Sequence, residues 1–214
     1  MRAVLLDLGI REYGEVWSHQ LKLVSERALN KVGDTLLLVE HPDVITMGRK
    51  SQRLEIKGGG DFPIFNIERG GQATYHGPGQ LVGYPIINIG QKGLDIVTLV
   101  RLLEEVLIRT ASDFGVKATR VEGKPGVWLH GGEKKLASIG LAIRHWVTFH
   151  GFALNVNTNL SRFDIIRPCG MDSSIMTSLE QCRSKRVPMQ DVKASVVSNF
   201  EALFGYEMVP GHAK

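Results

Sequence analysis

The sequence predicts an α+β fold in which a mixed β-sheet is flanked by helices. Stretches that are apolar and rich in branched residues, as strands are, outnumber the helical stretches and follow one another in runs. Such runs favour a mixed sheet over the regular strand–helix alternation of a doubly wound parallel sheet. The 214 residues contain no internal repeat, low-complexity tract or linker, so we expect a single domain spanning residues 1–214.

The N-terminal half is expected to contain most of a sheet, one helix and a glycine-rich loop. The predicted strands are residues 3–8, 35–40, 44–48, 64–68 and 81–89, and the predicted helix is residues 14–30. One face of that helix carries Trp17, Leu21, Val24 and Ala28 at helical spacing. Gly33 is expected to stop the helix. Residues 57–61 lack the Lys-Ser/Thr ending of a phosphate loop and predict a flexible turn.

The C-terminal half is expected to alternate helices with two antiparallel hairpins. The predicted strands are residues 116–121, 126–129, 135–144 and 147–156. Asp95 caps a predicted helix over residues 96–114, whose apolar stripe is interpreted as core. Ser173 is expected to cap a short helix through Leu179, and residues 181–186 are expected to be exposed. A last helix follows Pro188 and ends at Gly205, with Val192, Val196, Phe200 and Leu203 on its buried face.

Composition bounds the functional classes. No apolar run approaches the ~20 residues that a membrane span requires. Asp7 comes too early for the apolar region of a secretory signal, so we expect none. With only two cysteines, we expect a reducing, cytoplasmic environment and no disulfide. The net charge of +4 is too diffuse for nucleic acid but favours acidic protein partners. Basic residues proposed for that surface are Arg144, Arg162, Lys185 and Arg186.

The stretch from Arg69 to Pro85 is the most informative part of the chain. Its sequence is Arg-Gly-Gly-Gln-Ala-Thr-Tyr-His-Gly-Pro-Gly-Gln-Leu-Val-Gly-Tyr-Pro. Glycine permits positive φ and close approach of the backbone to a ligand. A plain glycine hairpin is the alternative, but a hairpin needs only one glycine pair and gains nothing from Arg69 and His76.

This stretch resembles the lipoyl(octanoyl) transferase family. The matching positions are Arg69, Gly70, Gly71, Thr74, His76, Pro78, Gly79, Gln80, Tyr84 and Pro85. Ala73 departs from the β-branched residue usual there, which we expect to affect strand packing only. A second family pattern is matched by Glu40, His41, Val44, Thr46 and Gly48. From the residues alone, His41 is equally compatible with a functional role and with a hydrogen bond at a strand end.

Cys169 and Lys135 are the candidate catalytic residues. Cys169 lies between Pro168 and Gly170 in a predicted loop, whereas Cys182 fits an inert, buried hydrophobe. A nucleophilic thiol needs a base or cation nearby. Spacing alone leaves Lys135 undecided between such a partner and a solvated lysine at the start of a strand. The resemblance implies a Cys-Lys dyad, because the family's Lys-x-x-Ser/Ala-x-Gly and Pro-Cys-Gly motifs are both matched.

The resemblance also implies the substrate site and the reaction. The expected substrate-binding residues are Arg69, Gly70, Gly71, Gln72, Ala73, Thr74, Tyr75, His76, Ser138, Ile139, Gly140, Gly151, Phe152 and Ala153. An octanoyl group would pass from acyl carrier protein, through a thioester on Cys169, to a lysine of a lipoyl domain. The expected acceptors are lipoyl domains of 2-oxoacid dehydrogenase complexes and the glycine cleavage H protein.

Two alternative functions accompany this reading. The resemblance extends to the catalytic-domain fold of biotin and lipoate protein ligases, so an ATP-dependent ligase is one alternative. The other is a non-catalytic module that binds an acyl group or a lipoyl domain, and it would tolerate loss of Cys169. A transferase needs no ATP, because conversion of a thioester into an amide is downhill, and we expect no metal and no cofactor.

Overall fold

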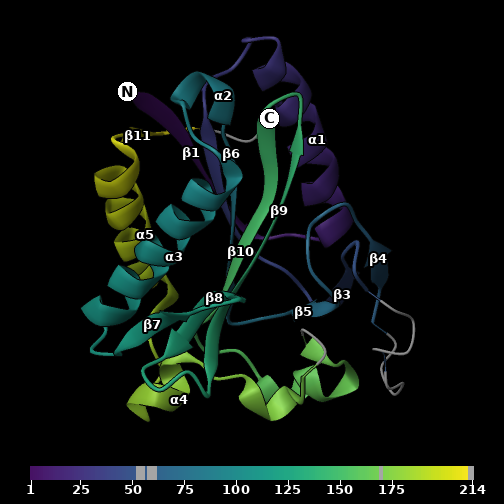
Figure 1. Ribbon diagram of the computed structural model, residues 1–214, viewed down its shortest axis with the longest axis vertical. Coiled ribbons are helices and arrows are strands. Elements are labelled where there is room, and N and C mark those ends of the chain that lie inside the picture. The colour runs from purple at the N-terminus through teal and green to yellow at the C-terminus, as the bar shows by residue number, and fades with distance from the viewer. Residues whose placement is uncertain (52–55, 57–61, 169–170, 212–214) are drawn as a thin grey trace.

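A computed structural model describes residues 1–51, 56, 62–168 and 171–211, and it contains two β-sheets (Figure 1). The large sheet has eight strands in the order β11-β1-β2-β6-β10-β9-β8-β7, and the small sheet has the order β4-β3-β5. The bounds of the large-sheet strands are β1 (Arg2–Ile10), β2 (Thr35–Glu40), β6 (Gln80–Ile86), β7 (Ala118–Val121), β8 (Lys124–Leu129), β9 (Lys135–Arg144), β10 (Val147–Asn155) and β11 (Glu207–Pro210). Those of the small sheet are β3 (Val44–Met47), β4 (Ile64–Asn66) and β5 (Thr74–His76).

The large sheet is mixed, which confirms the predicted α+β class. Strand β1 pairs in parallel with β2 and β11, whereas the pairs from β2 through β6, β10, β9 and β8 to β7 are antiparallel. The antiparallel pairing of residues 135–144 with residues 147–156 was predicted and is found between β9 and β10.

Helices cover both faces of the large sheet (Figure 1). Helices α3 (Ile96–Asp113) and α5 (Met189–Phe204) pack together on one face, and α1 (Tyr13–Ala28) packs on the other against β6 and β10. Along β2, Leu36 and Leu38 join the core beneath α3 and α5, and Leu37 and Val39 join the core beneath α1. A strand covered on both faces is apolar throughout, which explains its continuous hydrophobic sequence. No helix among the described residues is long and apolar enough to cross a membrane.

The ends of α3 and α5 follow their capping residues as predicted. The side chain of Asp95 accepts a hydrogen bond from the backbone of Thr98, which starts α3 at Ile96. Gly205 adopts a left-handed conformation and ends α5 at Phe204.

Helix α1 differs from its prediction in both its end and its buried face. It ends at Ala28, and the left-handed residue beyond it is Asn30 rather than Gly33. Its buried residues are Tyr13, Val16, Gln20, Leu23, Val24 and Arg27, whereas Trp17, Leu21 and Ala28 are only partly buried. The apolar pattern misplaced the face because two polar residues on it, Gln20 and Arg27, are buried by hydrogen bonds to distant partners.

The helix predicted from Ser173 to Leu179 is wrong. A 3₁₀ turn (Ser173–Ile175) follows Asp172, whose side chain accepts a hydrogen bond from the backbone of Ser174. Helix α4 (Leu179–Arg183) begins where the predicted helix would have ended, because the side chain of Ser178 caps it. Cys182 lies on α4 and is exposed, so its interpretation as a buried hydrophobe is also wrong, although the expected exposure of residues 181–186 is confirmed.

Smaller differences concern strand ends and short elements. The strand expected over residues 81–89 ends at Ile86, because Asn88 caps the short helix α2 (Ile89–Lys92). The short strands β5 and β11 were not predicted. A second 3₁₀ helix spans Leu160–Ile165. The turn predicted at residues 57–61 lies outside the described residues.

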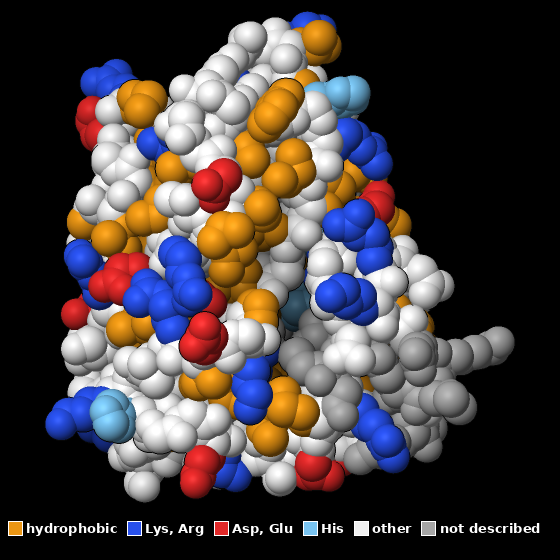
Figure 2. Space-filling model, in the orientation of Figure 1, with side chains coloured by type: hydrophobic (Ala, Val, Ile, Leu, Met, Phe, Trp, Pro, Cys, Tyr) orange, Lys and Arg blue, Asp and Glu red, His pale blue; other side chains and the backbone are white. Residues whose placement is uncertain are grey.

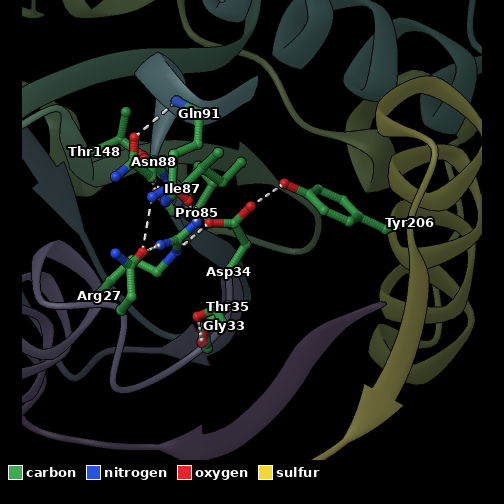
Figure 3. A network of polar contacts seen from close by, with 11 residues as sticks. Arg27, Gly33, Asp34, Thr35, Pro85, Ile87, Asn88, Gln91, Thr148 and Tyr206 are labelled. Atoms are coloured by element: carbon green, nitrogen blue, oxygen red, sulfur yellow. Dashed lines mark hydrogen bonds and ion pairs between the residues drawn. The ribbon is translucent and has the colours of Figure 1, made fainter. Parts of the chain in front are cut away.

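A buried carboxylate joins four elements at one end of the large sheet (Figure 3). Asp34 precedes β2 and lies 2.7 Å from Arg27 Nε on α1. The same carboxylate accepts hydrogen bonds from the backbone N–H of Asn88, which caps α2, at 3.0 Å and from the hydroxyl of Tyr206, which precedes β11, at 2.5 Å. Burial and this hydrogen bond both raise the pKa of Tyr206, so its hydroxyl remains a donor. Asp34 therefore links α1, α2 and the C-terminal strand β11 to the start of β2.

We expect Asp34→Ala to lower the free energy of unfolding by about 3–5 kcal/mol, because Arg27 would remain buried without its counter-charge. Tyr206→Phe should cost only about 1 kcal/mol, since it removes one hydrogen bond and no charge. Urea denaturation followed by circular dichroism measures both. Similar small losses in the two variants would contradict the assignment of Asp34 as the common partner.

Candidate active site

A cavity of about 830 Å³ lies between the glycine-rich loop and the central strands of the large sheet. Its walls come from residues 69–74, from β5, β6, β8, β9 and β10, and from the first turns of α1 and α3. Figure 2 shows the face on which a hollow is bordered by hydrophobic side chains and by Lys and Arg side chains. A volume of this size is typical of small-molecule sites.

The loop at residues 69–71 is fixed by the side chain of Arg69. This guanidinium is buried and donates hydrogen bonds to the carbonyl and hydroxyl oxygens of Thr46 on β3 and to the carbonyl of Gly70. The backbone N–H of Gly70 donates to Leu141 O of β9 at 3.0 Å. The loop is therefore attached to both sheets, to the small one by its side chain and to the large one by its backbone.

Gly71 and Gly48 occupy positions that disfavour a side chain, whereas Gly70 does not. Gly71 has a φ of +87°, a conformation that side chains disfavour, whereas a Cβ on Gly70 would meet nothing closer than 3.8 Å. Gly70 therefore does not use the positive φ that glycine permits. Gly48, directly after β3, is the more constrained position, because a Cβ there would lie 2.5 Å from Gly71 O and 2.7 Å from Arg69 Nη1.

A chain of amide groups orients His76 at the cavity wall. Asn155 Nδ2 donates to Thr177 O, so its Oδ1 accepts from Gln80 Nε2 at 3.0 Å. The side-chain oxygen of Gln80, Oε1, then accepts a hydrogen bond from His76 Nδ1 at 2.7 Å. With its proton on Nδ1, His76 has Nε2 as an acceptor, 3.4 Å from the hydroxyl oxygen of Thr46. Burial is the main cause that lowers the pKa of His76, to about 3, so the ring is neutral.

His41 lies behind this wall and is held by two hydrogen bonds. Its Nδ1 donates to Arg11 O at 2.7 Å, and its Nε2 accepts from the hydroxyl of Tyr84 at 2.8 Å. Burial lowers its pKa to about 4. Of the two roles open for His41, the structure supports a hydrogen bond that positions Tyr84, a cavity residue.

His150 lines the cavity in an unusual backbone conformation. It has a φ of +56° within β10, and its side chain is buried. Its Nε2 lies 3.5 Å from a carboxylate oxygen of Glu68, and neither ring nitrogen has a hydrogen-bond partner among the described residues. Burial lowers the pKa of His150 to about 4, although Glu68 opposes the shift. His150 was not predicted as a site residue.

Glycine lets neighbouring groups pack closely against the central strands of the large sheet. Gly140 of β9 faces Gly151 of β10. A Cβ on Gly151 would lie 2.1 Å from Gly83 O, and a Cβ on Gly83 would lie 2.1 Å from the ring of Phe152. The ring of Phe152 therefore occupies the space that a side chain at Gly83 would fill, and it forms part of the cavity wall.

Lys135 lies on the cavity wall and is only 3% exposed. Its Nζ lies 5.2 Å from the centroid of the Trp128 indole, within the range of a cation–π contact. The alternative of a solvated lysine at a strand start is therefore wrong for Lys135. Lys134, by contrast, is exposed, as expected, and its ammonium donates to Ser174 O.

The cavity gathers most of the predicted substrate-binding residues. Those on its wall are Arg69, Gly70, Gly71, Gln72, Ala73, Thr74, His76, Ser138, Ile139, Gly140, Gly151, Phe152 and Ala153. Tyr75 is the exception. Because neighbouring residues of a strand point to opposite sides, its ring lies away from the cavity, against Phe163, and its hydroxyl donates to Asp43. Cys169 lies outside the described residues, so its proximity to Lys135 stays a prediction.

Several cavity residues were not predicted as site residues. They include Tyr13, Arg49, Lys50, Val82, Tyr84, Ile96, Val100, Lys124, Trp128 and His150. Tyr84 could have been predicted as a site residue, because it lies within the glycine-loop motif. Val100 belongs to the stripe of the predicted helix that was interpreted as core, and it packs against that core but also lines the cavity. Ile96, at the start of the same helix, was not part of the stripe. Among the described residues, no group of three His, Cys, Asp or Glu could hold a metal ion.

Comparison with known proteins agrees with this geometry. The sequence profile of the lipoyl protein ligase A/B catalytic domain matches residues 12–201. The octanoyltransferase of Syntrophotalea carbinolica is 50% identical over 197 residues, covering 92% of each chain. The chain belongs to the octanoyltransferase family. A second relative, the octanoyltransferase of Caldicellulosiruptor bescii, is 46% identical over 206 residues. This match covers 92% of this chain and 90% of the relative.

Solved structures support the fold of this octanoyltransferase-family protein. A putative lipoate protein ligase of T. acidophilum, Ta0514, has a TM-score of 0.77 at 16% identity and covers 100% of this chain and 90% of its own. The biotin protein ligase of Aquifex aeolicus has a TM-score of 0.55 at 12% identity, with coverage of 96% and 69%. The predicted likeness to the biotin and lipoate protein ligase fold is confirmed.

We expect Gly48→Ala to abolish most activity of this octanoyltransferase-family protein, because the new methyl group would displace both Gly71 and Arg69. Gly70→Ala is the matched control and should retain most activity, since its methyl group has room. Steady-state kinetics on both variants, together with melting temperatures, provide the test. A Gly70→Ala variant as damaged as Gly48→Ala would show that loop flexibility, not the position of Arg69, matters.

We expect the free energy of unfolding to fall as the pH decreases from about 6.5 towards 4. The pKa values of His41, His76 and His150 are lowered in the folded state. In this pH range these histidines therefore bind protons in the unfolded chain but not in the folded chain. Three such groups correspond to a slope of about 4 kcal/mol per pH unit. Urea denaturation at several pH values measures the slope, and His41→Gln should reduce it by about a third. A stability that does not change from pH 7 to 5 would contradict these assignments.

Proposed function

We propose that this protein transfers an octanoyl group from acyl carrier protein to the ε-amine of a lysine on a lipoyl domain, through a thioester on Cys169. The observation that carries this proposal is Lys135, a lysine buried on the wall of the cavity that the glycine loop also lines. Buried lysines are rare, and ionisable groups that line a cavity are concentrated at functional sites. The names of the curated relatives support the same activity.

In the first half of the proposed reaction, the thiolate of Cys169 attacks the carbonyl carbon of the donor thioester. A carbon–sulfur bond forms, and the tetrahedral intermediate places a negative charge on the former carbonyl oxygen. The intermediate collapses by breaking the bond to the pantetheine sulfur, which takes up the proton of the Lys135 ammonium and leaves as a thiol. Lys135 is then neutral and can act as a base in the second half. The octanoyl group remains on Cys169 as a thioester.

Backbone N–H groups of the loop are suited to stabilise the oxyanion. Gly70 was one candidate, but its N–H already donates to Leu141 O. The N–H groups of Gly71 and Gln72 have no acceptor among the described residues, and both residues line the cavity. We therefore assign Gly71 and Gln72 to the oxyanion site, since preorganised donors lower the barrier for such intermediates.

In the second half, the amine of the acceptor lysine attacks the Cys169 thioester. A carbon–nitrogen bond forms, the bond to Cys169 sulfur breaks, and the amine loses a proton to Lys135. Conversion of a thioester into an amide is downhill, so the proposal includes no ATP. The proposed acceptors are lipoyl domains of 2-oxoacid dehydrogenase complexes and the glycine cleavage H protein, in the cytoplasm.

We expect octanoyl acyl carrier protein, without an acceptor, to add one octanoyl group to Cys169 and none to Cys182. Lys135→Arg should retain much of the reactivity of Cys169 towards a small alkylating agent, because a positive charge remains. It should lose acyl transfer to the amine by about 100- to 10,000-fold, because arginine does not act as a base. Lys135→Ala should lose both.

Intact-mass spectrometry and peptide mapping of the protein with both cysteines present locate the octanoyl group. Alkylation and single-turnover transfer are then compared in a Cys182→Ser background, because Cys182 is exposed. Octanoyl groups mapped to another residue would refute the cysteine mechanism. Wild-type transfer by Lys135→Ala would refute the dyad. Formation of product only with ATP and free octanoate would instead favour a ligase.

A further inference from the structure

The cavity carries more positive charge than an octanoyl chain requires. The cationic residues on its wall are Arg49, Lys50, Arg69, Lys124 and Lys135, and no Asp or Glu of the described chain lines it. An octanoyl group is neutral, and the amine of an acceptor lysine is cationic until it loses a proton. Neither ligand benefits from this charge, so the wall is suited to an anion.

Two of these five residues have roles within the site. Arg69 donates its hydrogen bonds to Thr46 and Gly70, and Lys135 is buried against Trp128. The side chains of Arg49, Lys50 and Lys124 are exposed at the cavity, and none forms an ion pair with a carboxylate of the described residues. Figure 2 shows Lys and Arg side chains beside the hollow on this face.

The backbones of these three residues are fixed although their side chains reach solvent. The N–H of Arg49 donates to Arg69 O, and the N–H of Lys50 donates to Gly71 O, both at 3.0 Å, so this pair moves with the glycine loop. The carbonyl of Lys124 accepts from the indole N–H of Trp128, and its ammonium lies 5.4 Å from the centroid of the same ring. Lys124 and Lys135 thus contact one indole, one from the exposed and one from the buried part of the wall.

We propose that Arg49, Lys50 and Lys124 bind the phosphate of the phosphopantetheine arm that presents the octanoyl thioester. This inference rests on the proposed function, in which the thioester enters beside Lys135. The phosphate is the only permanent negative charge on the arm, and it precedes the thioester on the way in from the carrier protein. Arginine and lysine form strong, charge-assisted hydrogen bonds with phosphate oxygens. A nucleotide phosphate offers the same chemistry, so the experiment must separate the two sources.

Two small donors separate the phosphate from the rest of the substrate. Octanoyl-4′-phosphopantetheine and octanoyl-pantetheine carry the same thioester and acyl chain and differ only in the phosphate. We expect the second-order rate of acylation of the wild-type protein to be about tenfold higher with the phosphate-bearing donor. A difference of this size corresponds to one charge-assisted hydrogen bond. Because the contact is exposed, raising the salt concentration should reduce this preference.

The variants Lys124→Gln and Arg49→Gln/Lys50→Gln should bring the preference towards one. Lys31→Gln is the matched control, because Lys31 is equally exposed but lies outside the cavity, and it should retain the wild-type preference. The measured quantity is the ratio of the two second-order acylation rates, obtained from intact masses. A ratio is insensitive to a general loss of folded protein, so a structural effect of the substitutions would leave it unchanged.

Equal rates for the two donors in the wild type, or an unchanged preference in every variant, would overturn this inference while leaving the proposed function intact. No acylation by either donor, while octanoyl acyl carrier protein acylates the protein, would overturn the inference alone. No acylation by octanoyl acyl carrier protein either would overturn the proposed function, and the inference with it. A second arm supplies ATP and free octanoate. Pyrophosphate release that decreases in Lys124→Gln would assign these cations to a nucleotide and would also overturn the inference.

Discussion

The side chain of Arg69 is the contact on which the cavity depends. It leaves a loop that is bonded to β9 of the large sheet and ends on Thr46 of the small sheet, so this guanidinium helps to hold the two sheets together beside the cavity. Because Arg69 is buried, its charge has to be met by hydrogen bonds, and the carbonyl and hydroxyl oxygens of Thr46 supply them. Gly48 and Gly140 leave the room through which the side chain passes.

Glycines beside the cavity leave room for larger groups of neighbouring strands and of the loop. A sheet covered on both faces ordinarily fills its centre with side chains, as β2 does. At Gly83 the ring of Phe152 takes the place of a side chain, and at Gly140 the side chain of Arg69 does. These glycines therefore determine where a ring and a guanidinium on the cavity wall can lie.

Local signals made much of this structure predictable. Long strands, the capped ends of α3 and α5, and the glycine loop depend on residues close in sequence, and these predictions were confirmed. Contacts between distant residues were not predictable in this way. The burial of Lys135 depends on Trp128 of another strand, that of Arg27 depends on Asp34, and the side to which Tyr75 points depends on the short strand β5. A family motif identifies Tyr75 as a neighbour of the site but does not say which way its ring points.

The cavity combines neutral buried histidines with two buried cations, Arg69 and Lys135, and with exposed cations. Its histidines are buried and stay neutral, since desolvation lowers their pKa values, and Tyr84 keeps its proton for the same reason. Its exposed cations lie on the residues that flank the glycine loop and at the start of β8. A neutral chain is thus favoured inside and an anionic arm outside. In the proposed reaction the thioester lies at the boundary, where Lys135 and the loop N–H groups meet, so charge develops only where donors are already in place and little water has to reorganise.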